Sequence, residues 1–374
     1  MDARLATNGR PRMFGGRLLA AMAALTLMGA IATATAAPYI PRSDAEVLAE
    51  VPPGTAHVTA PALQVTRTRL DVALPLAQFY ITRSRATGDL RFLGYAEATL
   101  QPWLNQPAAL VLHATILQSR HAFEASLEEL DRALAMQPDN SQAWLTRATI
   151  LRVLGRYAQA IASCDRVADA AITTLCNSSI RSLTGHLESA YTTLVSLPTQ
   201  SLSDAARAWR CSELGEMAER LGRDDAAERW FTNGLNLAPD DLYTRAAYSD
   251  LLLRQGRNAE VLQLLANYRS MEPMLLRVAI ASAGDGAQTL ASAFSVEEQR
   301  GDAVHRREQA RFLLDVARQP RQALAAAREN WQIQREPDDI LILLRAARAA
   351  NSPADAVPAL EFVRQHQLED KRLP

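Results

Sequence analysis

A short signal occurs three times in this chain: MQPDN at residues 136–140, LAPDD at residues 237–241 and REPDD at residues 335–339. In each copy the proline ends one helical unit, and the residues after it begin the next. The three prolines lie 101 and 98 residues apart, which is close to three units of about 34 residues. The sequence therefore predicts a repeat array, a kind of protein that usually works by offering a surface rather than a catalytic cleft.

The clearest unit covers residues 208–241. Gly215 places a small residue where a neighbouring helix must come close, and Gly222 supplies the left-handed conformation that ends a helix. The second helix of the unit then carries one apolar stripe, at Ala227, Phe231, Gly234 and Leu235. This unit resembles a tetratricopeptide repeat over its whole length.

Two further units, residues 141–174 and 107–140, look like the same family, although His121 stands where the turn usually has glycine. Weaker copies fill the remainder of residues 66–371, so we expect about nine hairpins of roughly 34 residues. Each hairpin has an apolar face that only a neighbour can cover. We therefore expect an all-α protein. The resemblance implies a tetratricopeptide-like α-solenoid of stacked helical hairpins that winds as a right-handed superhelix.

The N-terminus has the pattern of a secretory signal peptide over residues 1–37. Four arginines precede an apolar run at residues 18–31, and Ala34-Thr35-Ala36 forms a cleavage site. The alternative is an uncleaved membrane anchor, although the run is shorter than the roughly 20 residues that span a bilayer. We expect a periplasmic or secreted protein of a Gram-negative bacterium, with no membrane span in its mature form.

A proline-rich segment, residues 38–65, separates the signal peptide from the array. A capping box at residues 43–46 predicts a short helix from about residue 44 to residue 50. The rest of the segment either runs extended as a tether or packs along the first hairpin.

Composition excludes several kinds of function. Removal of residues 1–37 changes the formal charge from −1 to about −4, so the chain lacks the basic field of a nucleic-acid-binding protein. Lys371 is the only lysine, which excludes phosphate-loop and Schiff-base chemistry. We expect no cofactor.

Candidate reactive residues are few. Cys164 and Cys176 fall on helices that should pack together, so they form either a disulfide or two buried thiols, and Cys211 stays unpaired. His305 and Glu308 share a helix face, but no third ligand stands beside them in sequence, so we expect no metal site. No catalytic constellation is present, and we expect that the chain is not an enzyme.

The inner groove of such an array is lined by the first helices of the units. Here carboxylates stand beside aromatic rings, a surface suited to a basic, extended protein segment. The alternative is a solvated acidic helix face. The candidate groove residues are Gln142, Arg152, Trp209, Glu213, Glu216, Tyr243, Asp250 and Arg254.

These observations together predict a tetratricopeptide-like scaffold or adaptor of the cell envelope that binds a protein or peptide partner. Two alternatives remain open. One is a structural subunit of an envelope assembly, held through its outer face. The other is a periplasmic enzyme or metal carrier that uses residues 272–307.

Overall fold

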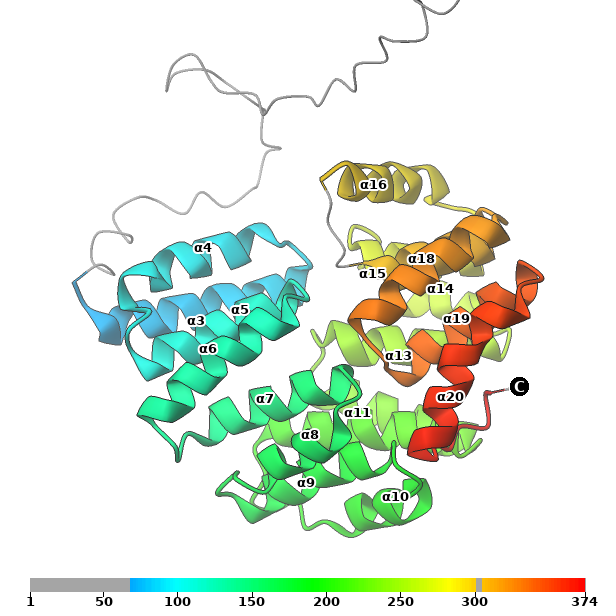
Figure 1. Cartoon of the computed structure of the whole chain (residues 1–374). Coiled ribbons are helices and arrows are strands. Elements are labelled where there is room, and N and C mark those ends of the chain that lie inside the picture. The colour runs from blue at the N-terminus through cyan, green and yellow to red at the C-terminus, as the bar shows by residue number, and fades with distance from the viewer. Residues whose placement is uncertain (1–67, 301–304, 374) are drawn as a thin grey trace, which may run out of the picture. The chain divides into compact units, whose positions relative to one another are not determined.

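The computed structural model describes residues 68–300 and 305–373, which belong to one compact unit, residues 59–374. The described residues contain eighteen α-helices, α3 to α20, and no β-strand (Figure 1). The predicted all-α solenoid of stacked hairpins is confirmed. None of these helices is long and apolar enough to cross a membrane. The expected signal peptide and proline-rich segment, with its short helix, lie outside the described residues.

The described helices pair consecutively as nine antiparallel hairpins. The first five consist of α3 (Leu70–Thr87) with α4 (Arg91–Leu100), α5 (Pro107–Ser119) with α6 (Phe123–Met136), α7 (Ser141–Val153) with α8 (Tyr157–Cys164), α9 (Ala170–Arg181) with α10 (Leu187–Ser196), and α11 (Asp204–Arg220) with α12 (Asp224–Leu237).

The last four hairpins consist of α13 (Leu242–Arg254) with α14 (Asn258–Leu264), α15 (Glu272–Ala281) with α16 (Ala287–Arg300), α17 (Arg306–Arg311) with α18 (Pro320–Ile333), and α19 (Pro337–Ala349) with α20 (Val357–His366). Short helical turns accompany them at η1 (Gln101–Trp103), η2 (Phe312–Val316) and η3 (Pro353–Ala356).

Close packing inside a hairpin depends on the small residues that the sequence places there. A Cβ atom added to Gly215 of α11 would overlap the ring of Phe231 on α12. Ala227 and Phe231 are fully buried on the same face of α12. The expected close approach at Gly215 is therefore observed.

Side-chain caps determine where two first helices begin. Helix α9 begins at Ala170, close to residue 171, where a weaker unit was expected to start, and Asp169 caps it by accepting a hydrogen bond from the backbone N–H of Ile172 at 2.9 Å. Helix α11 begins at Asp204, ahead of residues 208–241, because Ser203 caps it in the same way.

The hairpin turns use a left-handed residue whether or not glycine is available. Gly155 has φ +73° between α7 and α8, and His121 has φ +56° at the matching place between α5 and α6. His121 stacks on Phe123, with ring centroids 5.2 Å apart. A non-glycine residue therefore completes the second hairpin at some cost in backbone strain.

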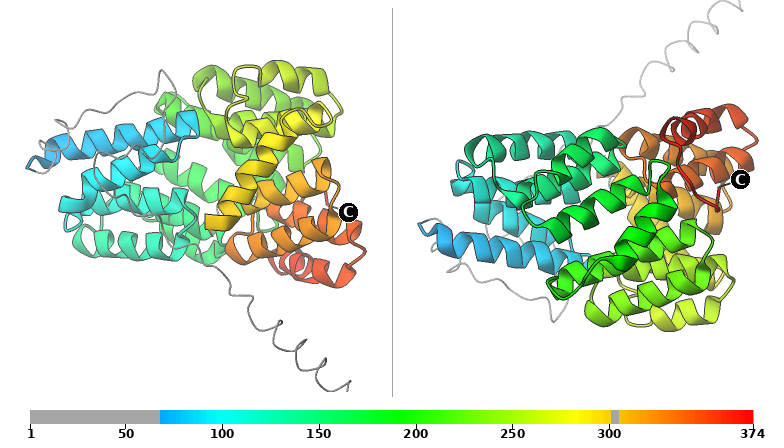
Figure 2. Two further views of the ribbon diagram at one scale, coloured as in Figure 1. Left: turned by 90° about the horizontal axis from the view of Figure 1, so that it is seen from above. Right: turned by 90° about the horizontal axis from the view of Figure 1, so that it is seen from below.

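The ninth hairpin and the residues after it pack against the third, fourth and fifth hairpins, as the red and green helices show in Figure 2. Three backbone N–H groups make this junction, each through a hydrogen bond of 2.8 Å. The donors and acceptors are Arg335 to the Val153 carbonyl, Leu187 to the Glu369 carboxylate, and Lys371 to the Arg220 carbonyl.

An apolar core crosses the same junction. Ile150 of α7 and Leu343 of α19 belong to one buried cluster, and the Phe362 ring of α20 packs against it. Phe362 also contacts the ring of Tyr157. A Cβ atom added to Gly155 would stand only 2.7 Å from the Phe362 ring, which is too close. The repeat array therefore curves until its last hairpin meets its middle hairpins.

Candidate functional site

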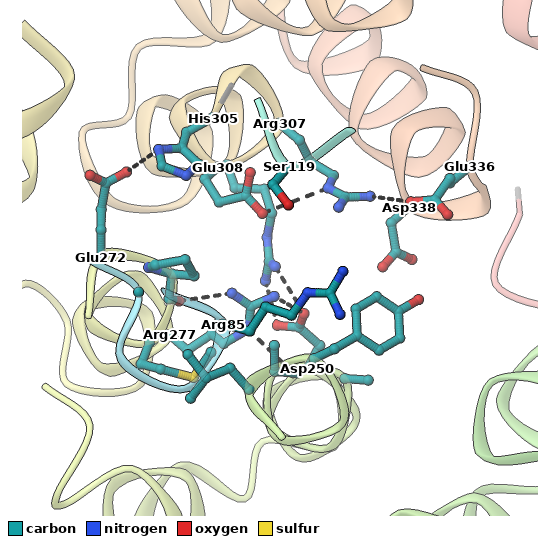
Figure 3. A pocket seen from close by; sticks show the side chains of 18 of the residues that line it. Arg85, Ser119, Asp250, Glu272, Arg277, His305, Arg307, Glu308, Glu336 and Asp338 are labelled. Atoms are coloured by element: carbon teal, nitrogen blue, oxygen red, sulfur yellow. Dashed lines mark hydrogen bonds and ion pairs between the residues drawn. The ribbon is translucent and has the colours of Figure 1, made fainter. Parts of the chain in front are cut away.

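A cavity of about 460 Å³ lies on the inner surface, where the curvature of the array brings first helices from most of the hairpins together (Figure 3). Its lining comes mainly from α3, α7, α11, α13, α15, α17 and α19. Charged side chains of both signs dominate it, and this volume is in the range of small-ligand pockets.

Four of the eight groove residues expected from the sequence line this cavity: Arg152, Glu216, Tyr243 and Asp250. They come from α7, α11 and α13, which are first helices as expected. Gln142 and Arg254 do not line it. Gln142 donates to the Thr146 hydroxyl at 3.3 Å.

Trp209 and Glu213 both contact other residues of the chain, and Trp209 is partly buried. Glu213 is buried and pairs with Arg152 at 2.7 Å, while the indole N–H of Trp209 donates to the same carboxylate at 3.1 Å. The Trp209 ring packs against two buried apolar clusters. Its main contacts are thus with its own chain.

Arginines of the chain neutralise most of the carboxylates that were expected to face a basic partner. Asp250 pairs with Arg277 at 2.5 Å and with Arg311 at 2.7 Å. Burial alone would raise the pKa of Asp250, but the two guanidinium groups outweigh it and lower that pKa to about 2. Arg254 likewise pairs with Glu219 at 3.2 Å.

The Glu216 carboxyl differs from that of Asp250 because no arginine in the described part of the chain pairs closely with it. Burial among protein groups, with the neighbouring Glu213 charge, raises the pKa of Glu216 to about 7. Its carboxylate accepts a hydrogen bond of 2.5 Å from the Tyr243 hydroxyl, whereas Arg152 is 4.0 Å away. Near neutral pH this carboxyl therefore carries a proton part of the time.

Arg85 of α3 is one of several cavity residues that sequence reasoning missed. Figure 3 shows its side chain reaching into the cavity, and it makes no hydrogen bond or ion pair with any residue that the structure describes. Removal of water by the surrounding protein lowers its pKa, and the Asp241 charge opposes this only in part. Arg85 lies on a divergent hairpin, so only the curvature of the array shows that it faces α13.

A second hollow adjoins the cavity. It has a volume of about 600 Å³ and lies between α3 and the segment at residues 238–243. Arg85, Leu242 and Tyr243 line both spaces. These residues mark the border between the two hollows, and more than half of the Tyr243 side chain is exposed there.

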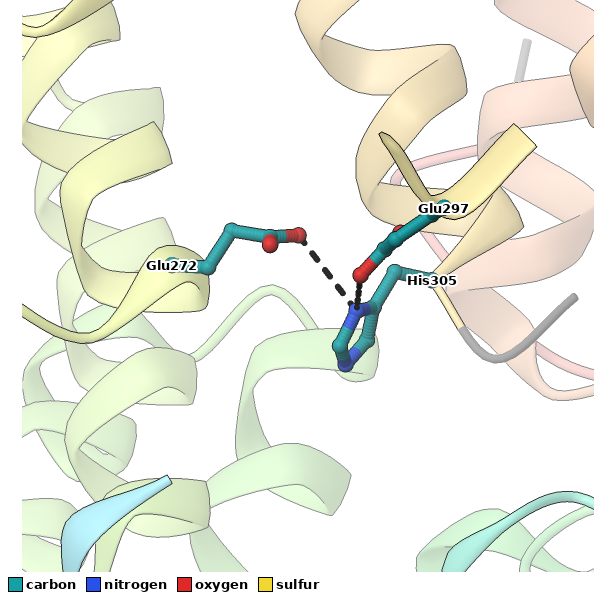
Figure 4. Close-up of side chains that lie close together, drawn as sticks. All are labelled: Glu272, Glu297 and His305. Carbon is teal, nitrogen blue, oxygen red and sulfur yellow. Dashed lines mark hydrogen bonds and ion pairs between the residues drawn. The ribbon is translucent and has the colours of Figure 1, made fainter. Parts of the chain in front are cut away.

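His305 stands at the cavity rim with two carboxylates that the sequence did not connect to it. Its Nδ1 atom lies 2.7 Å from Glu297 of α16 and 3.4 Å from Glu272 of α15 (Figure 4). Burial tends to lower the pKa of His305, but the hydrogen bond to Glu297 and the nearby carboxylates raise it to about 9. Because the three residues belong to different helices, a search for ligand spacing along one helix does not find them.

The cysteines are arranged as one bonded pair and one thiol. Cys164 at the end of α8 and Cys176 in α9 are joined, with their Cα atoms 5.7 Å apart. Cys211 is buried and free. Burial raises the pKa of the Cys211 thiol, which keeps it protonated.

Comparisons with known proteins point to repeat proteins. Residues 129–162 match a family described as tetratricopeptide repeat, and this range runs from the second half of α6 through α7 into α8. A search of curated proteins finds no significant match.

Solved structures similar to this chain include three proteins of low sequence identity. Pseudomonas aeruginosa pilF is 13% identical, with 82% of this chain and 94% of that chain covered and a TM-score of 0.27. The P58(IPK) tetratricopeptide domain is 15% identical, with coverage of 81% and 94% and a TM-score of 0.25. Yeast Tom70 is 14% identical, with coverage of 79% and 70% and a TM-score of 0.25.

The match at residues 129–162 covers one repeat length, and it lies within the series of helical hairpins that the structure describes at residues 68–300 and 305–373. The helices that the repeats would direct inwards are the ones that line the cavity. The repeat match therefore applies to residues 129–162, and the described helices around it are arranged as hairpins of the same kind.

Proposed function

We propose that this chain is an exported adaptor that binds an extended segment of a protein partner at its inner surface and makes or breaks no bond. The repeat architecture supports a scaffold for protein interactions. The N-terminal pattern of residues 1–37 supports export to the periplasm or the exterior. The cavity with its adjoining hollow is the proposed contact surface.

Arg85 is the observation that carries this proposal. Arg152, Arg277 and Arg311 each form an ion pair with a carboxylate of the chain. Arg85 has no such partner among the described residues. The Arg85 side chain is exposed to the two hollows, so a partner can reach its guanidinium group. A carboxylate of the partner would supply the missing charge and accept hydrogen bonds from the guanidinium, which are worth about 1.5–3 kcal/mol each.

This assignment reverses the charge expected of the partner. The sequence placed carboxylates in the groove and favoured a basic segment, but Glu213 and Asp250 are neutralised by arginines of the chain itself. The acidic groups are therefore much less available to a partner than their number suggests. We propose a segment that presents its own carboxylate to Arg85.

The two hollows provide the path for such a segment. It would lie between α3 and residues 238–243, pass Arg85 and Tyr243, and end in the inner cavity. The exposed Tyr243 ring offers apolar contact at the border, and Arg85 offers charge, a combination common in binding hot spots.

The test uses Arg85→Ala and the matched variant Arg83→Ala, because Arg83 lies exposed on the same helix. Tagged full-length protein is purified from its native cells, and captured partners are quantified by mass spectrometry. We expect wild type and Arg83→Ala to retain the same partner and Arg85→Ala to lose most of it. Equal capture by both variants would contradict the proposed site.

A defined probe tests the chemistry of the partner. Selection from a library of displayed peptides on purified protein should enrich sequences with acidic residues. Their affinity should fall at least about tenfold, or about 1.4 kcal/mol, in Arg85→Ala. Enrichment of basic peptides instead would restore the original expectation of a cationic segment.

Export is tested separately. Cell fractionation with N-terminal sequencing should find a mature chain that begins at Ala37 or Pro38. A chain that still begins at Met1 in the membrane fraction would show that the segment is an anchor.

A further inference from the structure

Glu272, Glu297 and His305 direct one ligand atom each toward a common point between α15, α16 and the start of α17 (Figure 4). These three atoms all lie within 4.8 Å of one another, and each side chain is about four-fifths buried. All three residues also line the cavity. The cluster joins the seventh hairpin to the eighth.

The polar groups of this cluster are incompletely satisfied by one another. A ring nitrogen can donate one hydrogen bond, and His305 Nδ1 is engaged with Glu297 at 2.7 Å. Glu272 Oε1 lies 3.4 Å from the same nitrogen, is buried and has no hydrogen-bond partner. Two carboxylates therefore meet at a single nitrogen, and one of them keeps an unpaired buried oxygen.

A divalent metal ion would satisfy all three atoms together. Nitrogen and oxygen ligands bind Zn²⁺ at about 2.0–2.2 Å, so the ligand atoms of one ion stand roughly 3–4 Å apart. A small outward movement of the Glu297 carboxylate would make room for the ion. We propose that Glu272, Glu297 and His305 form a binding site for a divalent transition-metal ion, with His305 coordinating through Nδ1.

The donor set decides the class of metal. One imidazole with two carboxylates suits Zn²⁺ or Mn²⁺, whereas Ca²⁺ and Mg²⁺ prefer oxygen ligands alone. Three protein ligands also leave at least one position for water. Because the ligands come from two successive hairpins, the ion would fix one hairpin against the next.

The chain contains a natural comparison for this site. His113 also lies near two glutamates, but its Nε2 faces Glu97 at 3.7 Å and its Nδ1 faces Glu129 at 3.5 Å. The two carboxylates thus face different nitrogens of the ring. A metal ion bound to either nitrogen could be reached by only one of them. His113→Ala is therefore the matched control for His305→Ala.

The experiment is calorimetric titration of ZnCl₂ into full-length protein that has first been stripped with EDTA. We expect one ion per chain, bound with a dissociation constant below about 10 µM, and a loss of at least tenfold in affinity in His305→Ala and in Glu272→Gln. His113→Ala should bind as wild type does. Circular dichroism shows whether each variant is folded, and Glu272→Gln decides the test if His305→Ala is not.

A second readout is independent of calorimetry. Saturating Zn²⁺ should raise the melting temperature of wild type and His113→Ala, because a ligand that binds only the folded state stabilises it. It should have little effect on Glu272→Gln. The proposal is overturned if wild type binds no ion, or if folded Glu272→Gln binds with unchanged stoichiometry and affinity.

Discussion

Single residues at the turns show how the closed arrangement depends on local conformation. Gly155 and Gly256 both have left-handed backbone, with φ +73° and +72°. Their surroundings differ, since a Cβ atom on Gly155 would stand 2.7 Å from the Phe362 ring, whereas nothing lies within 4 Å of one on Gly256. Alanine variants at these two glycines therefore separate the cost of backbone strain from the cost of disturbing the contact with Phe362.

We expect Gly256→Ala to destabilise the protein by about 1–2 kcal/mol through the left-handed backbone alone. Gly155→Ala should lower the free energy of unfolding by about 1–3 kcal/mol more, because its methyl group would overlap the Phe362 ring. Urea unfolding followed by circular dichroism measures both. Equal losses would mean that α20 moves aside easily and is only loosely docked.

The Glu216 carboxyl predicts a pH dependence of stability. Its pKa is 4.5 in the unfolded chain and about 7 in the folded protein, so the folded state holds the proton more tightly. The stability that this proton provides is complete below pH 4.5 and is lost as the pH rises through 7. Asp250 acts in the opposite direction, but only as the pH falls from 3.8 toward 2.

We therefore expect Glu216→Gln to flatten the decline in melting temperature between pH 5 and pH 8. Some decline should remain, because burial also raises the pKa of Asp339 to about 7. Glu361→Gln changes an exposed glutamate and serves as the control. An unchanged slope in Glu216→Gln would show that this carboxyl is ionised throughout that range.

At the scale of helices, most of what the structure contains could be predicted. The stripe at Ala227 and Phe231 and the small residue at Gly215 depend on neighbours within one hairpin, and local sequence records them. The start of α11 was predicted less accurately, since the cap at Ser203 was not recognised. A cap is a single polar residue, and many such residues stand elsewhere.

The disulfide prediction also belongs to this scale, because it joins two consecutive helices. We expect peptide mapping under non-reducing conditions to find Cys164 linked to Cys176 and Cys211 free. Replacement of both bonded cysteines by serine should cost about 3 kcal/mol in the chain-entropy model for so short a loop. Three free thiols in protein from its native compartment would refute the pairing.

At the scale of the whole unit, sequence reasoning identified only part of the site, because four of the expected groove residues line the cavity but Arg85 was not among them. Each hairpin is rotated slightly against the last, and the sum of these rotations decides which first helices finally face one another. The placements of Arg85 against α13 and of Arg152 against Glu336 both result from that sum. No local pattern contains it, so the groove was predicted as open and its charges as available.

The contact of the ninth hairpin with the middle hairpins predicts how hydrogen exchange changes when the C-terminal residues are removed. In a chain that ends at residue 336, hydrogen exchange should become faster at Leu187, because its N–H group loses the Glu369 carboxylate. Exchange should also become faster in the turn at residues 220–222, since its contact with Lys371 is removed as well. Exchange in α14 should change little. Unaltered protection at Leu187 would show that the ninth hairpin does not dock there.

The docking of the ninth hairpin also determines the order in which the fold can be completed. Most repeat arrays make contacts only between neighbours, so any part of the chain can fold as soon as it is available. Here Arg152 meets Glu336 across 184 residues, and Leu187 meets Glu369 across 182. Such contacts carry a loop-closure cost that local pairs avoid, and they slow folding. The middle hairpins can form while the chain emerges, but the junction must wait until the last forty residues or so have arrived. The complete lining of the cavity, which includes Glu336, Asp338 and Arg372, thus exists only after residue 372 has been synthesised.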